Sequence, residues 1–310
     1  MQIGLGELLS IGSAATWAVG VILYRQLGAR LPPLTLNFLK NSLVFAMVLA
    51  AIAVVHGLAP PDFRLDHLLL ALASGAIGIA IADTLYLRAL NEIGAGRMGV
   101  IGNLYSPLVV VMSVLFLGES LGLLQLLGFG LVMAGVGLVA HPAPPEPDAP
   151  ADAPAGAAAA AIAAPAPRTL RAVLLGVLAI ALMAVAIVMV KRVLEAQPVL
   201  WVTGVRMAGA LAGLVLIAAL RGELRLLRPP AGGLDWKRLV IAAVVGQFLS
   251  MVFWLGGYKY TQASVAAILN ETSSVFIVLL AWLWLGETMG PRGLAGVALA
   301  LAGVACMLAG

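Results

Sequence analysis

One six-residue phrase occurs twice in this chain, as Leu115-Phe116-Leu117-Gly118-Glu119-Ser120 and as Leu283-Trp284-Leu285-Gly286-Glu287-Thr288. Each copy lies between two long apolar stretches. The offset that carries Leu115 onto Leu283 also matches Gly122 with Gly290, Gly128 with Gly296, and Gly135 with Gly303. A register kept over this length predicts an internal duplication.

The duplication extends back into the early part of each half. With an offset two residues shorter, Pro32 aligns with Pro198 and Lys40 with Arg206. Between the halves, residues 141–170 are almost entirely alanine and proline with scattered acids, which favours a flexible, extended linker. We therefore expect a first five-helix repeat at 1–140, a linker at 141–170 and a second five-helix repeat at 171–310.

The composition is that of an integral membrane protein. Of the 310 residues, 62% are hydrophobic and only 10% are charged, which leaves too little polar surface for a water-soluble globule. Apolar runs of about 20 residues, long enough to cross a bilayer as helices, lie near 5–24, 34–55, 68–90, 97–117, 121–140, 171–190, 199–220, 238–258, 262–285 and 291–309. An odd number of spans per copy inverts the second copy, so the predicted fold is an all-α membrane protein of ten transmembrane helices in two inverted repeats.

The charges exclude several classes of function. The formal net charge of +4 is spread over loops, so we expect no nucleic-acid partner. The three histidines lie at loops or span ends, and no enzyme motif occurs, so we expect no catalytic residue, no metal and no cofactor. The first apolar run lacks a basic leader and a cleavage site, which favours a helix over a signal peptide. Loop cations favour both termini outside.

Four ionisable residues fall inside the spans, namely Lys40, Asp83, Arg206 and Glu271. Each costs about 2.5–3.5 kcal/mol at the centre of a membrane helix, so each is expected to face a partner or a wet cavity. Asp83 and Asn103 both lie roughly 10 Å below the same predicted loop, at 1.5 Å per helical residue. The repeat offset carries Asn103 onto Glu271, so the two halves present polar groups at matched positions.

Amide, hydroxyl and aromatic side chains accompany these acids at helical spacing. Such a lining suits a small organic molecule better than a bare ion. The predicted substrate-binding residues are Trp17, Asp83, Tyr86, Asn103, Gln247, Trp254, Asn270, Glu271 and Ser274. Tyr24, Tyr258, Tyr260 and Trp201 are interpreted instead as part of the aromatic belt at the membrane interface. For Trp17 and Trp254, which lie deeper, both interpretations stay open.

Asp83 and Glu271 are also candidates for proton coupling. A low-dielectric cavity disfavours the charged form of a carboxyl group, so either acid could take up and release a proton during a transport cycle. The alternative is a static acid that braces the helices through an ion pair or hydrogen bond. Pro107 leaves the carbonyl of Asn103 without a helical donor, which predicts a kink that is either part of the site or purely structural.

Other residues are assigned structural roles. Lys40 and Arg206 lie a turn or two inside the membrane, where long stems can extend to the headgroups, and we expect them to anchor their helices. Glu119 and Glu287 are expected to stand at helix starts, beside free N–H groups. The glycines around 128–135 and 296–303 allow close helix packing.

The two five-helix copies resemble the drug/metabolite transporter superfamily, and specifically its ten-helix EamA-type members. The resemblance rests on the doubled Leu-Gly-Glu turn, the basic residue after a proline in helix 2 of each copy, and the stretch from Thr16 to Gly20. It implies an exporter or permease for small metabolites such as amino acids or drug-like compounds, with a central cavity lined by helices 1, 3, 4, 6, 8 and 9. Lys40 departs from the arginine usual there, and the family's usual topology, with both termini inside, opposes the loop charges.

We therefore predict a secondary transporter of a small-molecule substrate that works by alternating access in the cell (inner) membrane, as a multi-pass protein surrounded by the lipid bilayer. Two other classes stay open, a non-transporting membrane scaffold and a membrane-embedded transferase, which can lack recognisable motifs. The substrate, the direction of transport, the coupling ion and the oligomeric state do not follow from these residues.

Overall fold

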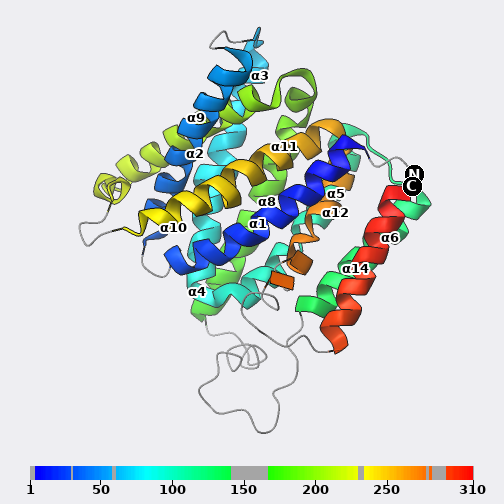
Figure 1. Cartoon of the computed structure of the whole chain (residues 1–310). Helices are drawn as coiled ribbons and strands as arrows, with labels where there is room; N and C mark the ends of the chain where they lie inside the picture. Colours follow the sequence, from blue (N-terminus) through cyan, green and yellow to red (C-terminus); the bar gives the residue numbers. More distant parts are fainter. Residues whose placement is uncertain are drawn as a thin grey trace.

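The computed structural model describes residues 4–28, 31–57, 61–140, 167–229, 234–276, 279–280 and 291–309. Every regular element assigned in these ranges is helical (Figure 1). The first half contains α1 (Leu5–Gly28), α2 (Pro33–His56), α3 (Leu65–Gly75), η1 (Ala76–Ile81), α4 (Ala82–Gly102), α5 (Tyr105–Leu117) and α6 (Leu123–Ala140). The second contains α8 (Pro167–Ala196), α9 (Val199–Leu220), η3 (Leu224–Leu227), α10 (Trp236–Ile241), η4 (Ala242–Leu249), α11 (Ser250–Tyr260), α12 (Ala263–Asn270), a stretch at 273–276, and α14 (Pro291–Ala309).

Apolar helices account for the expected spans. Five helices in the described part of the chain are long and apolar enough to cross a membrane, at Pro33–His56, Leu65–Glu92, Leu170–Ala196, Val199–Leu220 and Trp236–Tyr260. Shorter apolar helices lie at Leu5–Val21, Tyr105–Leu117, Leu123–Leu138 and Leu294–Ala309. The remaining expected span, 262–285, is described only in part. The all-α membrane fold predicted from the sequence is confirmed.

The second helix of each repeat begins at a proline. Pro32 is the N-cap residue of α2 and Pro198 that of α9, both with extended backbone angles. A proline is suited to a helix start because it lacks the N–H that would be unsatisfied there. Lys40 and Arg206 each follow eight residues later and thus occupy equivalent places.

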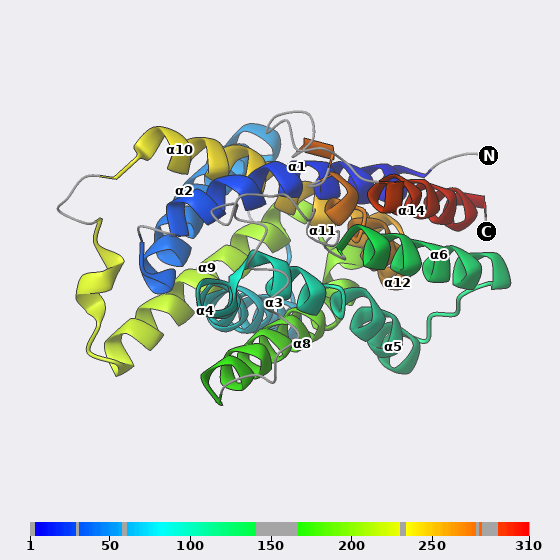
Figure 2. The same ribbon diagram turned by 90° about the horizontal axis from the view of Figure 1, so that it is seen from below.

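The first helix of each repeat packs into the other repeat. Helix α1 lies along η4, α11 and α12, whereas α8 lies along α3, η1, α4 and α5 (Figures 1 and 2). Helix α1 crosses η4 where Gly20 meets Gly246, so closely that a Cβ atom on Gly20 would lie 2.5 Å from the Cα of Gly246. The equivalent crossing of α8 and η1 brings Ala186 against Gly78. Neither half therefore completes its core alone.

The last helices of the two repeats, α6 and α14, form a pair at one edge of the molecule (Figure 1). Their glycines face one another in antiparallel order, with Gly128 against Gly303 and Gly135 against Gly296. A Cβ atom on Gly303 would lie 2.7 Å from the carbonyl oxygen of Gly128, so only glycine permits this approach.

Helical irregularities occur at matched positions in the two halves. The π-helical segments η1 and η4 interrupt the third helix of each repeat. The fourth helices are broken at Asn103–Leu104 and at Glu271–Thr272, two sites related by the offset of the Leu-Gly-Glu repeat. Segments of π-helix are often found at functional sites. The irregular backbone therefore marks the same region in both halves.

Two boundaries differ from the sequence-based expectation. The loop expected between spans 68–90 and 97–117 is helical, because α4 continues through it to Gly102. Gly94 and Gly96 weaken a helix by only about 1 kcal/mol each, and no proline is present to end it. The second repeat begins earlier than expected, since α8 starts at Pro167, inside the range assigned to the linker.

Candidate functional site

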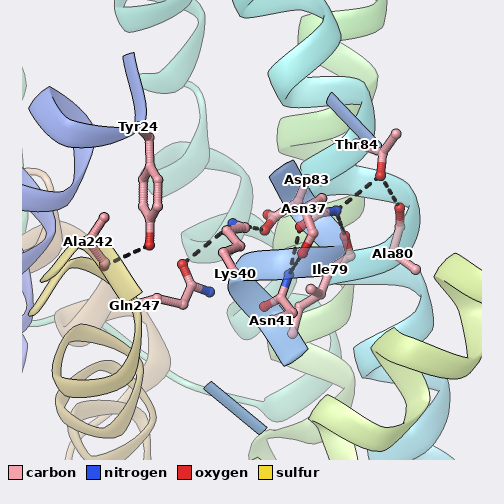
Figure 3. A network of polar contacts seen from close by, with 10 residues as sticks. All are labelled: Tyr24, Asn37, Lys40, Asn41, Ile79, Ala80, Asp83, Thr84, Ala242 and Gln247. Carbon is pink, nitrogen blue, oxygen red and sulfur yellow. Dashed lines mark hydrogen bonds and ion pairs between the residues drawn. The ribbon is translucent and has the colours of Figure 1, made fainter. Parts of the chain in front are cut away.

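Lys40 is the centre of a buried polar cluster (Figure 3). Its Nζ atom lies 2.8 Å from Oδ2 of Asp83 in α4 and 3.5 Å from Oε1 of Gln247 in η4. It also stands 5.2 Å from the centre of the Tyr24 ring, close enough for a cation–π contact. The ammonium group of Lys40 therefore contacts helices of both repeats.

Two asparagines extend this cluster along α2. Asn37 donates to the carbonyl of Ile79 at 2.9 Å and to the hydroxyl of Thr84 at 3.0 Å, and Asn41 donates to the side-chain oxygen of Asn37 at 2.7 Å. Ile79 belongs to η1, so the amide ties the π-helical segment to α2 (Figure 3). These bonds satisfy polar groups that an apolar surrounding would otherwise penalise.

Arg206 occupies the equivalent place in the second repeat but has no equivalent partner among the described residues. Its side chain is among the largest that are fully buried, and its guanidinium carbon lies 5.5 Å from the Trp254 ring centre. Its Nε and Nη1 atoms have no hydrogen-bond partner among the described residues, and no described carboxylate lies within 4.0 Å. The ionisable groups near enough to interact electrostatically with it are Tyr105, Tyr258 and Asp83.

The backbone explains how Arg206 comes to be buried. Gly75 of α3 faces the main chain of Arg206, and Gly209 of α9 faces that of Leu72. Because neither glycine has a side chain, α3 and α9 approach closely. A Cβ atom on Gly78 in η1 would lie 2.7 Å from the Cβ of Ala186 and 3.8 Å from Nη2 of Arg206, so η1 also approaches this side chain closely. The guanidinium is therefore enclosed between α9, η1 and α11.

Tyr105 and Tyr258 join the two repeats beside this arginine. Their hydroxyl oxygens are 2.9 Å apart, and the ring of Tyr258 packs edge-on against Trp254 with the ring centres 5.2 Å apart. Next to Tyr105, the backbone N–H of Ser106 donates to Oε1 of Glu271 at 3.1 Å. Glu271 is 7% exposed and makes no ion pair within the described ranges.

The headgroup position expected for Lys40 and Arg206 is wrong. Their residues are only 3% and 2% exposed, and both side chains point into the interior. The belt interpretation is also wrong for Tyr24 and Tyr258, which are 5% and 0% exposed; Tyr24 donates to the carbonyl of Ala242 at 2.9 Å. Each of these polar groups has an interior partner or ring contact, so it lies in the core without extending to the headgroups.

The helical periodicity of α2 could have revealed that Lys40 is buried. Asn37, Lys40 and Asn41 fall on the same helical face as Val44 and Val48, both fully buried. The depth of a residue along a helix does not give the direction of its side chain, whereas the periodicity does.

The structure distributes the other predicted site residues over several surroundings. Trp17 is half-buried against Tyr24, with the ring centres 6.3 Å apart, and Tyr86 packs partly buried in the adjoining apolar clusters. Asn103 lies in the break before α5. Asn270 donates to the carbonyl of Ala266 in its own helix, and the backbone N–H of Ser274 bonds to the carbonyl of Glu271. Side-chain contacts therefore join Asp83 and Gln247 through Lys40, while Trp254 lies against Arg206.

Glu119 stands at a helix start, as expected for this acid, but the helix belongs to the other repeat. Its carboxylate accepts from the backbone N–H groups of Ala263 and Ser264 at 2.7 and 3.0 Å and from the Ser264 hydroxyl at 2.7 Å. These are the first residues of α12, where a negative charge is favoured. Glu287, its repeat equivalent, lies outside the described residues.

A pocket of about 320 Å³ opens beside Glu119, between the ends of α5, α8 and α11. Its cations are engaged: Lys191 bonds to Glu195 and to the carbonyl of Thr261, and Lys259 donates to carbonyl oxygens at the end of α8. None of the residues around Lys40 or Arg206 lines this pocket.

The buried side chains offer charge, hydrogen-bonding groups and aromatic surface. Lys40 and Asp83 neutralise each other, Arg206 is a positive charge with no counterion among the described residues, and Glu271 is an acid held there by one backbone N–H. Within the described ranges, no three His, Cys, Asp or Glu side chains lie close enough together to hold a metal ion.

Comparison with known proteins agrees with this architecture. The chain is 26% identical over 129 residues to the threonine/homoserine exporter RhtA of Escherichia coli (strain K12), and 41% identical over 78 residues to an uncharacterized transporter of Archaeoglobus fulgidus. These matches cover 42% and 25% of this chain and span only 43% and 26% of the relatives' own lengths.

A crystal structure shares the fold, with a TM-score of 0.74 over 97% of this chain and 95% of the other, at 18% identity. The sequence model of the EamA-like transporter family matches residues 4–140 and again residues 170–309. Two matches that together cover most of the chain establish the family. This membrane protein therefore belongs to the EamA-like transporter family.

Proposed function

We propose that the protein is a secondary transporter that exports a small organic solute by alternating access. The observation that carries this proposal is a set of charged groups buried between the repeats, namely the Lys40–Asp83 pair and Arg206, which has no counterion among the described residues. Charges in the apolar interior of a membrane protein are costly and are retained where a substrate or ion passes. Repeat interfaces near the midplane are the usual place for such sites.

The matched irregularities support alternating access. Both third helices contain a π-helical segment, and both fourth helices break at equivalent positions. The bond from Ser106 to Glu271 joins the two breaks across the repeats. Two inverted halves built alike can exchange conformations, which opens the site first to one side and then to the other.

Proton coupling is the second element of the proposal. Asp83 already has a cationic partner at 2.8 Å, whereas Glu271 receives only the N–H of Ser106 among the described contacts. An acid without a cation nearby changes its protonation at lower cost to the surrounding structure. Glu271 is therefore the main candidate for the coupling group, and Asp83 the second.

The substrate class proposed is small metabolites such as amino acids or drug-like compounds. Trp254, Tyr105 and Tyr258 offer aromatic surface, and Gln247 with the charged groups offers hydrogen bonds. The partial similarity to RhtA favours amino acids and export. A multi-pass helical protein of this kind suits the inner cell membrane, because outer-membrane proteins are built as barrels.

Counterflow in proteoliposomes tests the function. Vesicles loaded with a pool of unlabelled amino acids and metabolites are diluted into trace labelled solutes, and uptake is followed against empty liposomes. We expect saturable, trans-stimulated exchange of at least one solute. The surface variant Arg88→Gln, which removes only an exposed pair with Glu92, should exchange as the wild type does. A folded protein that exchanges no member of the pool contradicts the proposal.

A further inference from the structure

Lys40 and Arg206 are repeat-equivalent cations in different electrostatic situations. Asp83 lies 2.8 Å from Lys40, so the pair carries no net charge. The equivalent guanidinium has no carboxylate within 4.0 Å and leaves Nε and Nη1 without a partner among the described residues. A buried charge without a counterion is unfavourable, so its retention calls for an explanation.

We propose that Arg206 binds the carboxylate of the transported solute. This inference rests on the proposed function and adds to it the chemical group that the substrate must carry. The guanidinium presents planar N–H donors that match a carboxylate. The ligand would thus supply the countercharge that Asp83 supplies to Lys40 in the other half.

The charge of the site favours a carboxylate over a phosphate. Because Lys40 is neutralised, Arg206 contributes the one uncompensated positive charge of this described cluster. A carboxylate carries a single negative charge, whereas a phosphate monoester carries about −1.5 to −2 at neutral pH and would remain under-compensated in an apolar interior.

The neighbours of Arg206 fit the rest of such a solute. Trp254 lies 5.5 Å from the guanidinium carbon, and Tyr258 packs against that ring. Glu271 bonds to the backbone of Ser106, the residue after Tyr105, and its carboxyl group would face the ammonium group of the solute. A cation, an acid and aromatic rings around the same tyrosine pair match an amino acid with an apolar or hydroxyl side chain.

A binding experiment tests the carboxylate directly. The wild-type protein is placed in nanodiscs of phosphatidylcholine, which contain no lipid carboxylate, and its thermal unfolding is followed with L-threonine and L-phenylalanine, each beside its own carboxamide. The carboxamide keeps the size and the amine but lacks the negative charge. We expect the amino acid to raise the unfolding temperature and the carboxamide to bind on the order of 100-fold more weakly.

Variants separate binding from folding. Arg206→Met removes an uncompensated buried charge, so without ligand it should unfold at the same or a higher temperature than the wild type, yet lose the shift caused by the amino acid. Arg206→Lys keeps the charge, as Lys40 does in the other repeat, and should bind about tenfold more weakly because the planar fork is lost. A structural arginine would give the opposite result, with Arg206→Met unfolding at a lower temperature.

The possible failures are distinguishable. If amino acids and their carboxamides bind equally well, or if Arg206→Met keeps the preference for the carboxylate, the role assigned to Arg206 is overturned while counterflow still supports transport. If no solute produces either a thermal shift or counterflow, the proposed function fails together with this inference.

Discussion

Oε1 of Glu271 accepts a hydrogen bond from the backbone N–H of Ser106 at 3.1 Å. The acid lies at the break in the fourth helix of the second repeat, and the amide lies in the first turn of α5, directly after the matching break in the first. A carboxylate is favoured beside free N–H groups at the start of a helix. One repeat therefore holds the broken helix of the other at the position where both are irregular.

This contact predicts how Glu271→Gln behaves. The amide keeps a side-chain oxygen that can accept from Ser106, but it cannot take up or release a proton. We expect solute-driven proton flux to be lost, as measured with a pH-sensitive dye inside liposomes, while solute counterflow continues with a lower apparent affinity for a solute that carries an ammonium group. Asp83→Asn is assayed in parallel as the second candidate. Unchanged proton flux in both variants would show that coupling does not pass through these acids.

The ion pair between Lys40 and Asp83 predicts a non-additive effect on stability. Asp83→Asn leaves the ammonium group buried without a counterion and should lower the free energy of unfolding by about 3–5 kcal/mol. The double variant Lys40→Met with Asp83→Asn removes both charges and should recover a large part of this loss. Unfolding of the purified proteins in detergent gives the free energies of this double-mutant cycle. Strictly additive changes in the free energy of unfolding would argue against the ion pair.

Because Glu119 caps α12, its substitution should lower the free energy of unfolding more than substitution of a surface acid does. Glu119→Gln retains one oxygen for three donors, so we expect a destabilisation of about 1–3 kcal/mol. Glu92→Gln removes an exposed i,i+4 pair and should cost at most about 0.5 kcal/mol. Thermal unfolding of the two variants side by side provides the comparison, and equal effects would contradict the cap.

The contact between α6 and α14 predicts a difference between two glycines in the same pair of helices. A Cβ atom on Gly303 would lie 2.7 Å from the carbonyl oxygen of Gly128, whereas one on Gly130 would meet nothing within 4 Å. Gly303→Ala should therefore destabilise the protein by about 1–3 kcal/mol. Gly130→Ala should be neutral or stabilising, since alanine favours a helix by about 1 kcal/mol over glycine. Similar unfolding temperatures for both variants would rule out the close approach.

Much of the fold could be predicted because its signals are local or periodic. Hydropathy predicted the helices, and a constant offset predicted the two copies. The break before α5 was foreseen from Pro107, but Val275 stands at the equivalent position and the fourth helix of the second repeat still breaks. There Thr272 turns both its N–H and its hydroxyl to the carbonyl of Leu269, a competition with the helix that sequence alone does not reveal.

The candidate site could be predicted only in part, because its contacts join distant segments. Asp83 was expected to need a partner, yet that partner, Lys40, was assigned to the headgroups. Glu119 was expected at a helix start, but its donors, Ala263 and Ser264, lie in the other repeat. Pairings across the repeats depend on how the helices cross, which neither spacing nor composition encodes directly.

Because the first helix of each repeat packs against the other repeat, α1 is synthesised long before its neighbours. Tyr24 of α1 bonds to Ala242, which lies 218 residues further along the chain. At about 5–20 residues per second, the ribosome needs roughly 11–44 s to make that segment. During this interval α1 stands in the bilayer without η4 and α11, so its small residues at the crossing face lipid until the second half is inserted.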